Sequence, residues 1–124
     1  MNAQDFWIAA ESLGMVRLIM RNAAGLLEID TVLSDHRISE QFVSFPGRPI
    51  DLHFTRDLTV DLEFRDGPNA HTGRVEHGIT LRDQAGAELL RVFLVRPQGS
   101  DDHDPACVAA YRHLREQAEQ TVSA

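Results

Sequence analysis

The sequence predicts an α+β fold in which N- and C-terminal helices cover one face of an antiparallel β-sheet of about six strands. Near both ends of the chain, apolar residues recur at the three- and four-residue spacing of amphipathic helices. Between these ends, apolar and polar residues alternate in consecutive segments separated by short turn sequences, a pattern typical of antiparallel strands with one buried face. Segments that follow one another so closely are expected to be neighbours in space.

The first helix is predicted over residues 4–13, where Phe6 and Leu13 belong to an apolar stripe and Gly14 follows as a helix terminator. Residues 34–40 are predicted to form a loop, and residues 66–69 to end a strand. Alternation predicts strands at residues 16–20, 27–33, 50–55, 58–64, 75–81 and 90–94, with a brief apolar run at 42–45. The last helix is predicted to begin at Pro105, after the N-cap Asp104. Its buried stripe is predicted to contain Cys107, Tyr111, Leu114 and Ala118.

The composition is that of a single globular domain over residues 1–124, with 43% hydrophobic and 25% charged residues. The 12 basic residues, all Arg, and the 19 acidic residues give a net charge of −7, which argues against nonspecific nucleic-acid binding. The one cysteine, Cys107, excludes an internal disulfide and a multi-cysteine metal site. No segment approaches the roughly 20 apolar residues of a membrane-spanning helix, and no secretion signal is predicted. We therefore expect no membrane insertion and a cytoplasmic location.

An alternating strand has two faces, and helices on one side of the sheet leave the other side to water, a ligand or a second subunit. A chain of 124 residues with a broad, half-covered sheet fits assembly through that side. We therefore expect a homodimer, which is the commonest symmetric assembly.

Six histidines are the main chemical resource of the sequence, and their spacing matches no zinc motif. His53 lies in the middle of a predicted strand, on its polar side, next to the position of Asp51 on the same face. A neutral imidazole on a rigid strand is a good ligand for iron, haem iron included, because a hydrogen bond to its other ring nitrogen fixes its orientation. The alternative is a strand histidine that only contacts water.

Four further side chains are candidates for a binding site, each with a simpler alternative. His77 lies on the apolar side of its strand, where a hydrogen-bonded core or interface histidine is the alternative to a ligand. His71 lies in the loop 69–73, from which it could swing over a pocket or remain exposed without a specific role. Arg21 and Arg65 lie on or at the ends of strands and could bind a carboxylate in bidentate fashion, or form cross-strand ion pairs.

Two runs of sequence resemble the HemS/ChuX/HutX haem-utilisation proteins. The run 11–22, followed by residues 25–29, resembles the opening helix-to-hairpin passage of that family, and the run 78–86, continued by residues 89–94, resembles its terminal hairpin. A closing helix like residues 109–114 follows at the expected distance, so the likeness extends from about Asp5 to Leu114. The resemblance implies a curved antiparallel sheet with flanking helices. It also implies a short, single-copy member like ChuX, whose relatives pair as dimers, rather than the tandem two-copy HemS type.

The same resemblance implies a cytoplasmic haem-binding protein for the uptake, storage or transfer of haem. His53 falls where ChuX-like relatives have a histidine proposed to contact haem, and Arg21 stands where they have a second one. Arg21 and Arg65 then become candidate partners of the haem propionates, and His77 and His71 further candidates near the cofactor. Two alternatives stay open: a haem-degrading enzyme, and a non-haem dimeric module that uses its sheet for a partner or a small hydrophobic ligand.

Overall fold

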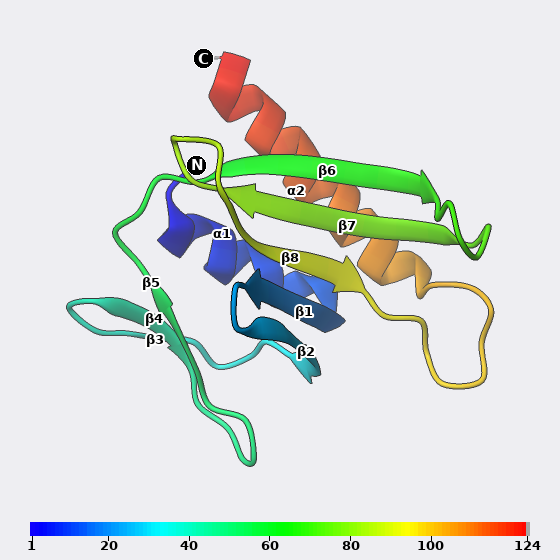
Figure 1. Cartoon of the computed structure of the whole chain (residues 1–124), viewed down its shortest axis with the longest axis horizontal. Coiled ribbons are helices and arrows are strands. Elements are labelled where there is room, and N and C mark those ends of the chain that lie inside the picture. Colours follow the sequence, from blue (N-terminus) through cyan, green and yellow to red (C-terminus); the bar gives the residue numbers. More distant parts are fainter. Residues whose placement is uncertain (124) are drawn as a thin grey trace.

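The computed structural model describes residues 1–123 and has the α+β fold that the sequence predicts (Figure 1). Helix α1 (Ala3–Ala10) and the 3₁₀ turn η1 (Glu11–Leu13) precede the strands, and helix α2 (Pro105–Ser123) follows them. The strands are β1 (Met15–Asn22), β2 (Gly25–Val32), β3 (Arg37–Ile38), β4 (Phe42–Phe45), β5 (Leu52–Thr55), β6 (Asp61–Pro68), β7 (Val75–Arg82) and β8 (Glu88–Leu94). Within the part of the chain that the structure describes, no helix is long and apolar enough to cross a bilayer.

The expected single sheet of about six strands is divided into two sheets. The larger sheet has the antiparallel order β2-β1-β8-β7-β6, and the smaller has the order β3-β4-β5. The division arises because residues 37–55 pair with one another, around the turn at 46–51, rather than with the strands on either side of them in the sequence. Figure 1 shows the smaller sheet standing apart from the larger one, beside α1.

Two local predictions were wrong, and both concern edges of the sheets. The predicted loop 34–40 contains β3, in which Arg37 and Ile38 pair with Ser44 and Val43. The predicted strand end at residues 66–69 is instead part of β6, which pairs with β7 as far as Pro68. A proline fits there because β6 is an edge strand, whose outer side needs no backbone donor. Residues 58–60 instead pair with the first residues of the chain. The backbone N–H of Ala3, for example, donates to the carbonyl oxygen of Leu58 at 2.7 Å.

The core lies between the larger sheet and the two helices. Leu18, Ile79 and Val92 lie side by side on three neighbouring strands, and all three are buried. The helices contribute the stripes that their sequences predict, with Phe6 and Tyr111 completely buried, except that Cys107 is only partly buried. Residues of both sheets and both helices belong to one hydrophobic cluster.

Gly14 is required where η1 approaches α2. Its φ of +71° lies in the left-handed region, and a Cβ atom there would come within 2.7 Å of the sulfur of Cys107. A larger residue would therefore strain the backbone and push α2 away from the start of β1.

The smaller sheet is fixed to α1 by aromatic packing. The rings of Trp7 and Phe54 stack with centroids 3.6 Å apart and planes 8° apart, and Phe45 packs edge-on against Phe54. Val43 and Phe45 of β4 are buried in the common core. This contact positions β5, and with it His53, relative to the larger sheet.

Candidate functional site

An apolar cavity of about 350 Å³ lies between α1, the smaller sheet and the larger sheet. Trp7 of α1, Phe54 of β5, and Leu81 and Leu90 of the larger sheet are among its lining residues. We call it the apolar cavity. Its size is at the lower end of the range of about 300–1,000 Å³ that is typical of ligand sites. Its aromatic and aliphatic lining suits a flat hydrophobic molecule.

His53 is the histidine that lines the apolar cavity. Its side chain is about half exposed, with Oγ of Ser44 2.7 Å from Nδ1 and Oδ2 of Asp51 3.2 Å from Nε2. Because a carboxylate only accepts, Nε2–H donates to Asp51 in the observed contact; in the tautomer in which Nδ1–H donates to Ser44, Nε2 carries the lone pair that a metal needs. The contact with Asp51 is long and exposed, and an ion pair of this kind is weak in water. Ser44 therefore orients the ring, while Asp51 competes for its ligating nitrogen.

His77 has a different environment, because it points toward α2 from the middle of the core face of β7. It is 6% exposed, and its Nδ1 is 2.8 Å from Oδ1 of Asp66, a distance that suits an ion pair although the direction does not suit a hydrogen bond. Its ring contacts those of Tyr111 and His103, with centroids 5.4 Å and 4.9 Å away. The sequence-based placement on the apolar side of the strand is thus confirmed.

A second cavity, of about 550 Å³, opens beside His77, and we call it the polar cavity. Its lining includes His103, Arg74, Arg96, Asp101 and Asp102, which come from the loops at one end of the larger sheet. Burial lowers the pKa of His103, and the positive charge of Arg96 lowers it further. His103 is therefore neutral at pH 7 and keeps a free nitrogen lone pair.

Tyr111 of α2 is completely buried and packs against the ring of His77. Its hydroxyl donates toward the carbonyl of Gly78 at 3.0 Å and that of Arg65 at 3.2 Å. Burial, and secondarily the negative charge of Asp66, raise the pKa of Tyr111 to about 12. The phenol therefore stays protonated across the physiological range and links α2 to β6 and β7.

The other three candidates from the sequence lie on the surface. Arg21 is exposed near the hairpin end of β1; it follows the cavity residue Met20 in the strand and so points to the opposite face. The side chain of Arg65 is 71% exposed and lies 3.9 Å from Glu63 of the same strand, β6, so this contact is not the cross-strand pair of the simpler alternative. His71 is exposed in the β6–β7 loop. The structure therefore places His53 and His77 at two different cavities and does not bring the five candidates together.

Sequence reasoning missed Trp7, Phe54 and His103 as residues of the two cavities. Phe54 could be recognised as an apolar strand residue, but its stacking on Trp7 joins positions that are far apart in the sequence. His103 stands in a polar segment, yet it is half-buried against His77. Neither contact has a signal in local periodicity.

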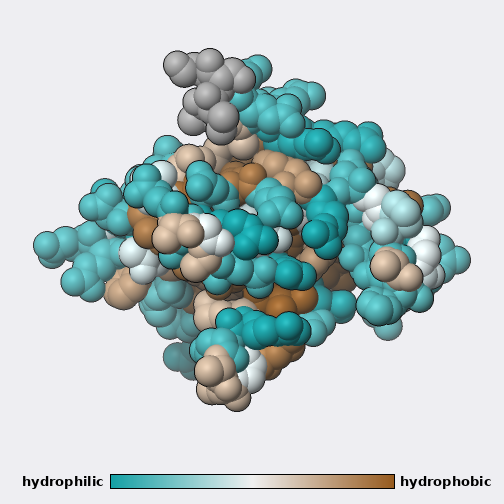
Figure 2. Space-filling view, turned by 45° about the horizontal axis from the view of Figure 1, so that its top comes forward, coloured by the Kyte–Doolittle hydropathy of each residue, from teal (hydrophilic) through white to brown (hydrophobic). Residues whose placement is uncertain are grey.

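The outer face of the larger sheet, away from the helices, carries paired charges. Arg17 donates to Asp30 across the β1–β2 pair at 2.7 Å and lies 3.1 Å from Glu28. The hydrogen bond and charge of Arg17 lower the pKa of Asp30, and the same contact raises the pKa of Arg17. Figure 2 shows a face of the molecule on which hydrophilic residues predominate and hydrophobic ones form smaller groups between them. Cross-strand pairing of arginine, the simpler alternative from the sequence, therefore holds for Arg17.

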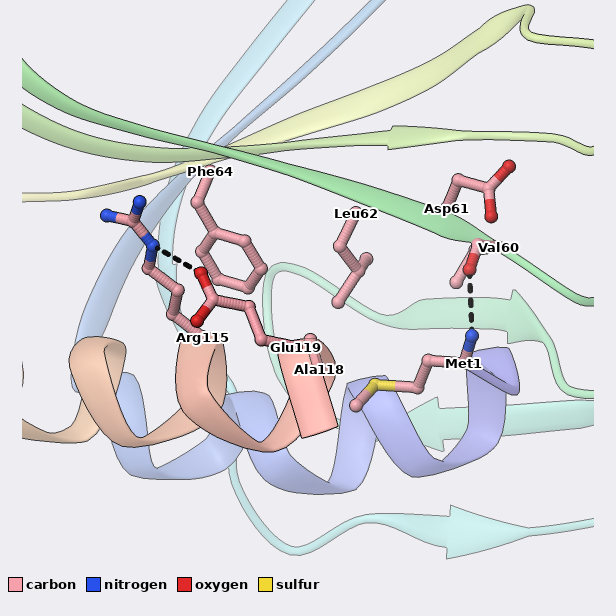
Figure 3. Close-up of a pocket in the computed structure, with 8 residues that line it drawn as sticks. All are labelled: Met1, Val60, Asp61, Leu62, Phe64, Arg115, Ala118 and Glu119. Atoms are coloured by element: carbon pink, nitrogen blue, oxygen red, sulfur yellow. Dashed lines mark hydrogen bonds and ion pairs between the residues drawn. The ribbon is translucent and has the colours of Figure 1, made fainter. Parts of the chain in front are cut away.

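A third cavity, of about 650 Å³, lies between β6 and α2 (Figure 3). Leu62 and Phe64 point into it from β6, toward Arg115 and Glu119, which form an ion pair at 3.2 Å. The lining includes Leu62, Phe64 and the charged Asp61 from β6, the Arg115–Glu119 pair from α2, and no histidine. It is therefore less suited to an iron-containing ligand than the cavity beside His53.

Comparison with solved structures identifies the fold. No protein-family model matches the sequence, and no curated protein matches it by sequence. A protein of Agrobacterium tumefaciens has a TM-score of 0.70 at 20% identity, over 91% of this chain and 64% of its own. The structure of ChuX has a TM-score of 0.69 at 18% identity, over 94% of this chain and 71% of its own. The holo form of PhuS, a haem-binding protein of Pseudomonas aeruginosa, has a TM-score of 0.68 at 22% identity, over 92% of this chain and 31% of its own.

This chain thus spans less than two thirds of the Agrobacterium protein and less than one third of PhuS, so it corresponds to a part of each. Nearly its whole length is superposed in every case. The resemblance to the HemS/ChuX/HutX proteins that the sequence predicts is therefore confirmed at the level of the fold, which this chain shares with ChuX and PhuS.

Proposed function

We propose that this protein binds haem in the apolar cavity, with His53 as the iron ligand, and acts in the cytoplasm as a carrier in haem utilisation. The observation that carries the proposal is that His53 is one of the residues that line an aromatic, aliphatic cavity. It gains support from the fold, because ChuX and PhuS are both described as haem-binding proteins. When bound, haem supplies an iron that accepts an imidazole nitrogen at an axial position.

The residues at the cavity fit such a ligand. The partly buried Phe54 and Leu58 offer apolar surface to a flat macrocycle, whereas Trp7 is buried against Phe54. A hydrogen bond from Nδ1–H of His53 to Ser44 leaves Nε2 available. Because the cavity is small, one edge of a porphyrin would remain in water, where its carboxylates are well solvated. Arg21, His71, His77 and Arg65 do not line this cavity, and Arg21 points to the opposite face of β1, so none of these four candidates is proposed as a propionate partner.

Hemin titration followed by the Soret absorption band tests the proposal. We expect His53→Ala to weaken hemin binding at least tenfold and to shift the Soret band, since the axial ligand is lost. His113→Ala, which removes an exposed histidine of α2, is the matched control and should bind like the wild type. Unchanged affinity and spectrum in His53→Ala would remove His53 from the site.

A second pair of variants tests the location. Met20 lines the apolar cavity and is 44% exposed, so Met20→Glu should fold while placing a charge at the cavity and weakening hemin binding. Met15 lies on the same strand, is 47% exposed and does not line this cavity, so Met15→Glu should leave binding unchanged. Equal affinities of the two variants would place haem elsewhere.

We propose carriage rather than degradation of haem. Incubating the hemin-loaded protein with an electron donor distinguishes the two functions. A carrier retains its Soret band and yields hemin on extraction, whereas a degrading enzyme releases an open tetrapyrrole. Fractionation of cells that express the protein tests the cytoplasmic location.

We also propose a homodimer that forms through the β1–β2 edge of the larger sheet. Strand β2 is an edge strand whose free backbone groups can pair with another strand, and the exposed apolar residues Leu26, Leu27 and Val32 lie along it. Light scattering should report a dimer for the wild type and a monomer for Leu27→Asp. The control Val75→Asp changes a similarly exposed apolar residue of β7 and should remain dimeric. If the dimer forms while hemin causes no Soret shift, the non-haem dimeric module is the better description.

A further inference from the structure

His53 lies between two hydrogen-bonding partners of different kinds. Ser44 of β4 stands opposite it in the β4–β5 pair, with its Oγ 2.7 Å from Nδ1. Asp51 lies two residues before His53 in the sequence, with its Oδ2 3.2 Å from Nε2. Both ring nitrogens therefore have a partner in the free protein, and a ligand must displace one of them.

The two partners differ in the tautomers that they accept. A serine hydroxyl can accept a hydrogen bond from Nδ1–H or donate one to the lone pair of Nδ1, so Ser44 fits both neutral tautomers of the ring. A carboxylate only accepts, so Asp51 fits only the tautomer that carries its proton on Nε2. The third neighbour, Phe42, has its ring centroid 5.9 Å from that of His53 and a side chain without a polar atom. Asp51 is therefore the contact that selects the tautomer.

The tautomer that Asp51 selects does not offer Nε2 to iron, because this nitrogen carries a proton in place of a lone pair. Nδ1 has a lone pair in that tautomer, but Oγ of Ser44 lies against it. For Nε2 to become a ligand, its proton must pass to water while Nδ1 takes a proton from water. The hydroxyl of Ser44 then turns from donor to acceptor. The ring loses one proton and gains one, so its charge does not change.

We propose that Asp51 is a positioning residue that keeps His53 in its non-ligating tautomer in the free protein and thereby weakens haem binding. This inference rests on the proposed function, because it concerns the same imidazole. The side chains of His53 and Asp51 are 50% and 56% exposed, so water replaces their contact at little cost when it breaks. A contact of this kind favours one tautomer without preventing the other. It suits a carrier, which must release its ligand as well as bind it.

Nitrogen NMR of the free protein, labelled with ¹⁵N-histidine, tests the tautomer. The measurement is made at about pH 8.5, where histidine side chains in general are neutral and their protonated and bare nitrogens give separate signals. We expect a smaller fraction of the Nε2–H tautomer of His53 in Asp51→Asn than in the wild type, since an amide can donate as well as accept. Asp57→Asn removes the same charge from an exposed residue and should keep the wild-type populations. Equal populations in all three proteins would overturn the proposal.

Hemin titration tests the consequence for binding. Asp51→Asn should bind hemin about two- to fivefold more tightly than Asp57→Asn, the range expected for the loss of one exposed contact. Iron-free protoporphyrin carries the same carboxylates but takes no axial ligand, so its affinity should be equal in the two variants. An equal gain for protoporphyrin would mean that Asp51 acts only through its charge, and equal hemin affinities would mean that it does not act on binding; either result contradicts the proposal.

Failure of this inference is distinguishable from failure of the proposed function. The tautomer measurement uses no haem, whereas unchanged hemin binding in His53→Ala would refute the haem site and with it the effect of Asp51 on haem. If His53→Ala loses hemin while Asp51→Asn binds it no better than Asp57→Asn, the haem site stands and the role of Asp51 is refuted.

Discussion

His53 and His77 occupy similar positions in the sequence, each in the middle of an alternating strand, yet their surroundings in the fold are opposite. The side chain of His53 is 50% exposed, on the small sheet that packs against α1, whereas that of His77 is 7% exposed beneath α2. The neighbours of His53 are Ser44 and Asp51, which are also in contact with water. Those of His77 are Asp66, Tyr111 and His103.

This difference separates two ways in which a protein can use an imidazole. An exposed ring can exchange one partner for another at little cost, because water replaces any contact that is lost. A buried ring must keep its partners, because an unsatisfied polar group in the interior is costly. His53 is thus suited to a ligand that enters and leaves, and His77 to a permanent structural arrangement.

The largest difference in unfolding free energy between the two regions is expected when the contact of Tyr111 in α2 with β6 and β7 is removed. We expect Tyr111→Ala to lower the free energy of unfolding by about 3–5 kcal/mol, because it leaves a cavity in the core and two carbonyls without their donor. Phe42→Ala, in the smaller sheet beside His53, should cost about 1 kcal/mol or less. Urea denaturation followed by circular dichroism measures both. Tyr111→Phe separates the loss of the hydroxyl, about 1 kcal/mol, from that of the ring.

Replacing each of the two histidines by alanine should show a smaller difference in unfolding free energy, due to the histidine side chains alone. His77→Ala should cost about 1–3 kcal/mol, because the neighbouring Asp66 loses its buried partner. His53→Ala should change the free energy of unfolding by no more than about 0.5 kcal/mol, as is usual for exposed residues. The same denaturation experiment applies. Equal costs would mean that burial does not distinguish the two environments.

The orienting role of Ser44 is a smaller effect that concerns only the exposed histidine. Ser44→Ala should weaken hemin binding about tenfold, because Nδ1 of His53 loses the acceptor that fixes the ring. Ser44→Thr keeps the hydroxyl on a residue that favours strands, and should retain the affinity. Soret titrations of the two variants decide the question, and identical affinities would show that the ring needs no such partner.

The smallest expected effect belongs to the exposed pair of Arg17 and Asp30 on the outer face. Because the pKa of Asp30 is lowered in the folded state, its contribution to stability is present above about pH 4 and is lost as the pH falls through the folded value. Asp30→Asn should therefore cost a few tenths of a kcal/mol at pH 7 and nothing at pH 2. Thermal unfolding at the two pH values measures this, and 1 M NaCl should remove the difference at pH 7. A cost that persists at pH 2 would point to packing instead.

The alternation of residues was sufficient to place His53 on a wet face and His77 on a buried one. It also located most of the strands and both helices, since these depend on the period of the backbone. It failed at residues 37–38 and 66–68, where pairing with a neighbouring strand outweighs local propensity. For the candidate sites, it supplied both strand histidines but not the residues that surround them.

The sequence by itself determined the α+β class, the order of the elements and the face on which each strand side chain lies, because these follow from short-range periodicity. Only the tertiary structure decided that the strands form two sheets, that Trp7 stacks on Phe54 beside His53, and that His103 reaches His77. Such contacts join positions distant along the chain, and they exist because burying both surfaces together is favourable, which no local pattern encodes.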